Sequence, residues 1–193
     1  MSKKVISDTA LVKQYMTGDN KALSILISRH RDKVYTSIYM FVKEDALAED
    51  IFQDTFIKVI DTLRRGKYYE DGKFLPWVMR IAYNLCIDHY RKVKRTPNFA
   101  NSEEFDIFNV LKYNEDNAEQ RMIKNQTYAK VRALIDELPA EQKEVVILRH
   151  YAEMSFKEIS KLTDVSINTA LGRMRYALIN MRKLITENAI PIR

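Results

Sequence analysis

Apolar residues recur at helical spacing along most of the chain, and this pattern predicts an all-α fold. The clearest stripe consists of Leu23, Leu26, Ile27, His30, Val34, Ile38 and Phe41. A second stripe follows a short joint at residues 43–45 and consists of Leu47, Ile51, Thr55, Phe56, Val59, Ile60 and Leu63. Each stripe gives one helix an apolar face that can bury against a neighbour.

Capping and turn residues set the limits of the amino-terminal helices. Ser7 or Asp8 can begin a first helix that ends near Met16, and Asp19 can cap the second. Residues 64–73 hold two of the four glycines and show no period, so we expect a loop there. A further helix is predicted over residues 74–95, because Pro76 fits its first turn and residues 96–98 end it.

The carboxyl-terminal half predicts further helices at residues 118–138, 140–153, 156–162 and 167–186. Only residues 163–166 separate the last two, which is the spacing of a helix-turn-helix motif. Residues 155–158 read Ser-Phe-Lys-Glu, a capping box that starts the first helix of the motif, and Ser166 can cap the second.

Charge divides the chain into two modules. The net charge is +6, but residues 101–120 carry one Lys against six Asp and Glu, between two basic segments. We therefore predict two helical domains, 1–96 and 121–193, joined by an acidic flexible linker at 97–120. Such basic domains favour a polyanion as partner.

Composition argues against several functions. One cysteine excludes an intramolecular disulfide and a thiolate-rich zinc cluster. His30, His89 and His150 lie in separate predicted helices without metal-ligand spacing, so we expect no metal and no cofactor. No apolar run is long enough for a signal peptide or a membrane span, which predicts a cytoplasmic protein without membrane insertion.

The predicted helix at 167–186 presents polar and cationic residues near its amino end, among them Asn168, Thr169, Arg173, Arg175 and Tyr176. Phe156, Ile159, Leu162 and Val165 can pack behind it against Ala170, Met174 and Ala177. An exposed helix of this kind is typical of one that enters a major groove. An ordinary helical hairpin with a solvated face is the alternative.

The helix that carries the second stripe has an acidic side formed by Glu49, Asp50, Gln53 and Asp54. Such a face repels phosphate, so it is either a solvated surface or a docking site for a basic protein partner. A nucleic-acid enzyme would need carboxylates clustered with further His or Asp partners to hold a metal ion. Here aromatic Phe52 and Phe56 stand among the acids in place of such partners, which argues against an enzyme.

The loop and the helix that follows it mix cations with aromatic residues. Arg64, Arg65, Lys67, Tyr68 and Tyr69 suit single-stranded nucleic acid, because bases stack on aromatic rings and the backbone follows positive charge. Asn84 lies on or beside the apolar side of the next helix, where it either bonds a backbone group or reads the edge of an extruded base.

The helix at residues 74–95, "FLPWVMRIAYNLCIDHYRKVKR", is apolar first and cationic last. Trp77, Ile81, Leu85 and Cys86 are interpreted as packing residues. Arg91, Lys92, Lys94 and Arg95 are interpreted as phosphate-facing, with a membrane surface as the weaker alternative.

Three segments in order, "AEDIFQDTFIKV", the helix just quoted, and "LPAEQKEVVILRHYAEMSFKEISKLTDVSINTALGRMRYALINMRKL", make the chain similar to the extracytoplasmic-function (ECF) class of bacterial sigma factors. The resemblance implies a non-enzymatic, alternative sigma factor. Its first domain would bind the clamp helices of the largest subunit of core RNA polymerase and open the −10 element. Its second would read the −35 duplex and meet the polymerase flap. An anti-sigma factor and a monomeric free state are also implied.

The resemblance assigns roles to single residues. Polymerase binding falls on Glu49, Asp50, Gln53, Asp54 and Phe56. Binding of the −10 element falls on Arg65, Lys67, Tyr68, Arg80, Asn84, Arg91 and Lys92. Binding of the −35 element falls on Ser166, Asn168, Thr169, Arg173, Arg175 and Tyr176.

The last helix departs from the family pattern. Leu171, Tyr176 and Leu178 stand where the family has polar or cationic residues, so the −35 preference is expected to differ. The main rival interpretation is a helix-turn-helix regulator, for example a dimeric repressor, that acts without being a polymerase subunit. That interpretation requires a dimer seam, and the sequence shows none.

Overall fold

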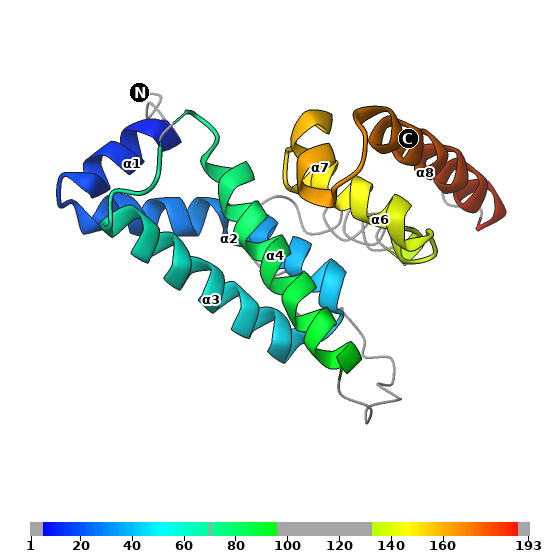
Figure 1. The fold of residues 1–193 in the computed structure, drawn as a ribbon, viewed down its shortest axis with the longest axis horizontal. Coiled ribbons are helices and arrows are strands. Elements are labelled where there is room, and N and C mark those ends of the chain that lie inside the picture. The colour runs from blue at the N-terminus through cyan, green and yellow to red at the C-terminus, as the bar shows by residue number, and fades with distance from the viewer. Residues whose placement is uncertain (1–5, 70, 96–132, 189–193) are drawn as a thin grey trace, which may run out of the picture. The chain divides into compact units, whose positions relative to one another are not determined.

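The computed structural model describes residues 6–69, 71–95 and 133–188 (Figure 1). All regular structure in these ranges is helical and no strand occurs in them, which confirms the predicted all-α class. The predicted linker at 97–120 lies outside the described residues, so the domain limits stay a prediction. None of the described helices combines the length and the apolar character that crossing a bilayer requires.

The chain forms two compact units. The amino-terminal unit extends over Met1–Phe99 and Ile147–Ser155, and the carboxyl-terminal unit over Ala100–Val146 and Phe156–Arg193.

The amino-terminal unit begins with α1 (Asp8–Met16) and α2 (Asn20–Val42), and the sequence predicts both starts. Ser7, rather than Asp8, caps α1, because its hydroxyl accepts a hydrogen bond from the Ala10 amide. Asp19 caps α2 by accepting from the Lys21 amide at 2.9 Å. These bonds satisfy amide groups that a helix leaves without partners at its first turn.

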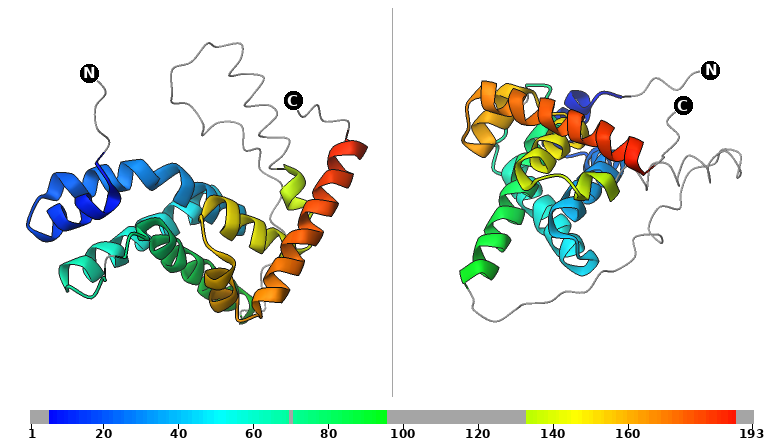
Figure 2. Two further views of the ribbon diagram at one scale, coloured as in Figure 1. Left: turned by 90° about the horizontal axis from the view of Figure 1, so that it is seen from above. Right: turned by 90° about the vertical axis from the view of Figure 1, so that its right-hand side faces the viewer.

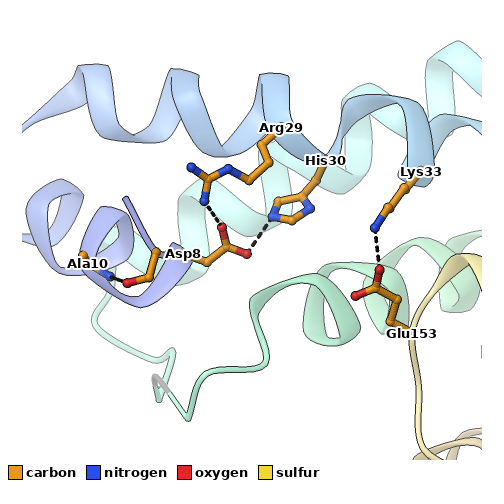
Figure 3. A network of polar contacts seen from close by, with 7 residues as sticks. Asp8, Ala10, Arg29, His30, Lys33 and Glu153 are labelled. Carbon is orange, nitrogen blue, oxygen red and sulfur yellow. Dashed lines mark hydrogen bonds and ion pairs between the residues drawn. The ribbon is translucent and has the colours of Figure 1, made fainter. Parts of the chain in front are cut away.

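Asp8 fastens α1 to α2 (Figure 3). Its carboxylate accepts a hydrogen bond from the Arg29 guanidinium at 2.5 Å, and its second oxygen lies 2.7 Å from His30 Nε2. His30 is buried and its ring packs near Phe74, 5.8 Å between centroids. His30 therefore both packs in the core against Phe74 and joins α2 to α1 through Asp8.

Helices α3 (Asp45–Arg64) and α4 (Phe74–Arg95) follow in the same unit and pack against each other and against α2 (Figures 1 and 2). The second predicted stripe is confirmed, because Ile51, Thr55, Phe56, Val59 and Leu63 are buried. Fully buried side chains from all three helices meet in the core, including Leu26, Ile38, Val59, Phe74 and Val78.

The carboxyl-terminal unit contains α6 (Ala140–Val146), α7 (Phe156–Thr163) and α8 (Ile167–Glu187). The predicted helix-turn-helix is confirmed at this level, because only three residues, 164–166, join α7 to α8. Asp164 adopts a left-handed φ of 54° in the turn, and the Ser160 hydroxyl donates to the Val165 carbonyl at 2.6 Å. Asp tolerates this conformation better than most residues.

The helix predicted at 140–153 is shorter and less regular than expected. It is α-helical only to Val146 and continues as a π-helical turn, η1 (Ile147–Tyr151). The Ala152 amide reaches back five residues to the Ile147 carbonyl at 3.2 Å, and the Arg149 guanidinium donates to the Met154 carbonyl. The Ala152 bond closes a wider turn than the α-helix allows.

Candidate nucleic-acid and protein-binding faces

Three exposed faces hold most of the predicted site residues, and the first is the outer side of α3. Asp50, Gln53 and Asp54 are exposed, and Glu49 is half-buried with its carboxylate 3.4 Å from the Gln53 amide nitrogen. We call this surface, together with Ile57, the α3 face. Because its charged groups are all acidic, it suits a basic protein surface and not a phosphate backbone.

Ile57 is the residue of this face that the sequence reasoning missed. Its side chain is 62% exposed, four residues after Gln53 and three after Asp54, so the three are neighbours on the helix surface. A large apolar side chain framed by acids is typical of the centre of a protein interface. The sequence did contain a sign of this exposure, because Ile57 directly follows Phe56 and lies outside the apolar stripe that the helix buries.

Phe56 has a different position from the other predicted polymerase-binding residues. It is 5% exposed, and its ring packs 4.9 Å from that of Phe52 in the core. It therefore lies beneath the α3 face and packs in the core of the unit.

The loop between α3 and α4 contains two adjacent tyrosines that differ in solvent exposure. Tyr68 is 8% exposed, with its ring centroid 4.2 Å from that of Trp77 and 6.3 Å from that of Phe74. Tyr69, next in the chain, is 86% exposed. Tyr68 therefore packs against α4, and Tyr69 is the loop tyrosine whose ring is open to solvent.

The second face is the solvent side of α4, which we call the α4 face. Arg80, Asn84 and Arg91 are exposed and lie in one row along the helix, opposite the buried Val78 and Ala82. The exposed Lys92 lies beside this row, and the loop adds exposed Arg65 and Lys67 at its other end. The row brings two cations and an amide to one surface, and the exposed Asp88 lies beside Asn84 and Arg91.

The buried side of α4 is chemically inert. Cys86 is buried, and its desolvation raises the pKa of the thiol to about 12. Among the described residues, no group of three His, Cys, Asp or Glu side chains is placed to hold a metal ion.

The third face is the outer side of α8. Ser166 caps the helix by accepting from the Thr169 amide at 3.0 Å, and the two hydroxyls are 2.8 Å apart. Ala170 and Ala177 are fully buried on the opposite side, as the sequence predicts. Asn168, Thr169, Arg175 and Tyr176 are exposed.

Arg173 differs from the other cations predicted for this face. Its side chain is only partly exposed, and its guanidinium lies 3.7 Å from the Glu144 carboxylate of α6. The family departures are on the surface instead, with Leu171, Tyr176 and Leu178 all exposed.

Comparison with known proteins identifies relatives over nearly the whole chain. A family profile described as Sigma-70 region 2 matches residues 26–96, and one described as Sigma-70, region 4 matches residues 128–175. The RNA polymerase sigma-H factor of Pseudomonas aeruginosa is 27% identical over 172 residues, which cover 86% of this chain and 88% of that protein. The ECF RNA polymerase sigma-E factor of Haemophilus influenzae is 26% identical over 192 residues, 97% of each chain.

A solved structure shows the same fold. The sigma factor RpoE of Bartonella quintana, in complex with the anti-sigma factor NepR, is similar with a TM-score of 0.62 and 16% identity. The match covers 86% of this chain and 98% of RpoE.

The two profile matches together cover more than half of the chain, and the chain belongs to the ECF class of the sigma-70 family. It is an alternative sigma factor for promoter recognition by RNA polymerase. Sigma factors are non-enzymatic transcription initiation factors, so the chain is not an enzyme.

Proposed function

We propose that the three faces divide the work of transcription initiation. The α3 face binds core RNA polymerase at the clamp helices of its largest subunit. The loop and the α4 face capture and open the −10 element. The α8 face reads the −35 element as duplex, and this domain also meets the polymerase flap. The observation that carries the proposal is the separation of charge within one unit, with acids on α3 and a cationic row on α4.

The α3 face supports docking to a basic partner. Glu49, Asp50 and Asp54 supply the charge, Gln53 supplies hydrogen bonds, and Ile57 supplies apolar area that is still open to solvent. Acidic groups around an apolar centre steer a basic surface into register and exclude water from the contact. Phe56 acts indirectly by holding the helix in place.

The α4 face supports capture of single-stranded bases. The amide of Asn84 can both donate to and accept from the polar edge of an extruded base. Tyr69 offers a ring on which a base stacks, and Arg80 and Arg91 flank Asn84 as partners for the DNA backbone. Because backbone contacts release counterions, affinity should fall steeply with salt.

The proposal is tested by separating duplex binding from strand opening. Asn84→Ala, in complex with core polymerase, is expected to bind −35 duplex DNA as the unchanged protein does and to lose most of its opening of the −10 element. Opening is measured by the fluorescence of 2-aminopurine placed in that element. Asn20→Ala, another exposed asparagine, lies at the start of α2 and outside the three faces, and serves as the matched control.

Equal loss of duplex binding and opening in Asn84→Ala would argue against a base pocket at α4. Operator binding without core polymerase, with no transcription in its presence, would favour the helix-turn-helix regulator instead.

Partners beyond polymerase and promoter DNA follow from the same family. RpoE, which shares this fold, was solved with an anti-sigma factor, and we propose that an anti-sigma factor also controls this protein. We further propose that the protein acts in the cytoplasm, is monomeric when free, and joins domains 1–96 and 121–193 through the linker at 97–120.

A further inference from the structure

The first two exposed turns of α8 place four residues side by side. Asn168, Leu171, Gly172 and Arg175 follow one another at spacings of three and four residues, so they form one strip on the helix surface. We call this strip the reading strip. Ala170 and Ala177 are fully buried on the other side of the helix, which fixes the strip toward solvent.

The reading strip combines an amide with an apolar side chain. Asparagine pairs with adenine through two hydrogen bonds in the major groove, and an apolar side chain contacts the 5-methyl group of thymine there. Leu171 is 44% exposed, so it presents apolar surface where a DNA-facing position commonly has a polar or cationic residue. The pair therefore matches A·T base pairs.

Gly172 leaves room for a close approach. A Cβ atom added at this position would meet no other atom within 4 Å, so the space beside Leu171 is open. Glycine inside a helix costs about 1 kcal/mol relative to alanine. A base edge or a sugar can approach the helix axis more closely here than at any position that carries a side chain.

The exposed surface of α8 offers fewer arginines for reading guanine than the sequence suggests. Arginine paired with guanine is the commonest specific contact in the major groove. Arg173, however, is partly buried and lies against the Glu144 carboxylate of α6, which offsets its charge. Arg175 is the exposed cation of the reading strip.

We propose that Asn168 and Leu171 read neighbouring A·T pairs of the −35 element, with Leu171 in contact with a thymine methyl group. This inference rests on the proposed role of α8 in reading the −35 duplex. It assigns a base preference to a residue at which this chain departs from its family.

The test begins with the full chain bound to core polymerase and a promoter library randomised in the −35 element. Selected sequences should share adjacent A·T pairs. Each selected thymine is then replaced singly by uracil, which removes only the 5-methyl group. One such replacement should weaken binding about fourfold, the effect expected for losing the burial of one methyl group.

Leu171→Ala should bind thymine and uracil templates equally, while Ile25→Ala keeps the difference. Ile25 is also 44% exposed but lies on α2, outside the three faces. Circular dichroism of both variants shows whether α8 is retained. If the unchanged protein binds thymine and uracil templates equally at every selected position, the inference is overturned while the proposed function stands. Failure to select or transcribe any promoter would instead overturn the proposed function.

Discussion

Removing the apolar centre of the α3 face gives the sharpest test of polymerase docking. Complete burial of an isoleucine side chain contributes about 1.5–3 kcal/mol. Because Ile57 is 62% exposed in the free protein, burial in a complex would recover about 1–2 kcal/mol of this. Ile57→Ala should therefore weaken binding to core polymerase about 5- to 30-fold.

The same change should leave the fold nearly unaffected, since surface substitutions usually alter the free energy of unfolding by about 0.5 kcal/mol or less. Binding is measured by titrating labelled protein with core polymerase and following fluorescence anisotropy. Ile25→Ala is the matched control, because Ile25 is 44% exposed on α2 and lies outside the α3 face. Equal affinities for Ile57→Ala and the unchanged protein would refute the docking centre, as would equal losses in both variants.

Three further predictions concern the acidic charge of the α3 face, the buried ring of Phe74 and the thiol of Cys86. Reversing charge with Asp50→Lys and Asp54→Lys should abolish co-purification with core polymerase. Asp32→Lys, a charge reversal on the exposed surface of α2, should leave co-purification unchanged. If the Asp50→Lys and Asp54→Lys protein still co-purifies, the α3 face is not the docking site. Phe74→Ala should lower the free energy of unfolding by about 3–5 kcal/mol in urea denaturation, because its ring is fully buried, and a loss below 1 kcal/mol would contradict that placement. Cys86 should resist a thiol reagent at pH 8 until the protein unfolds, since its raised pKa of about 12 keeps the thiol neutral. By the same shift, its contribution to stability is complete below about pH 9 and is lost as the pH rises toward 12.

Local chemistry explains what the sequence could predict. The stripes of α2 and α3 follow helical periodicity, and the caps at Ser7, Asp19 and Ser166 depend on residues a few positions apart. These features need no knowledge of the tertiary structure. The sequence predicted Asn84 on or beside the apolar side of its helix, whereas the structure places it on the exposed side, opposite Val78 and Ala82.

Tertiary packing explains what the sequence could not predict. Tyr68 and Tyr69 are chemically equivalent neighbours, and the buried ring is the one that packs against Trp77 and Phe74. The Arg173 guanidinium lies 3.7 Å from the carboxylate of Glu144, a residue 29 positions earlier in the chain, and is only partly exposed. The π-helical turn after Val146 likewise depends on bonds from Arg149 and Ala152 that no periodicity indicates.

The central claim is that this chain gives RNA polymerase its promoter specificity. The most direct measurement is transcription in vitro by purified core polymerase from a randomised promoter library, with and without the purified protein. The account predicts transcripts only in its presence, from templates that share a −35 and a −10 element at one spacing. No transcript above the level of core polymerase alone, from any template, would contradict it.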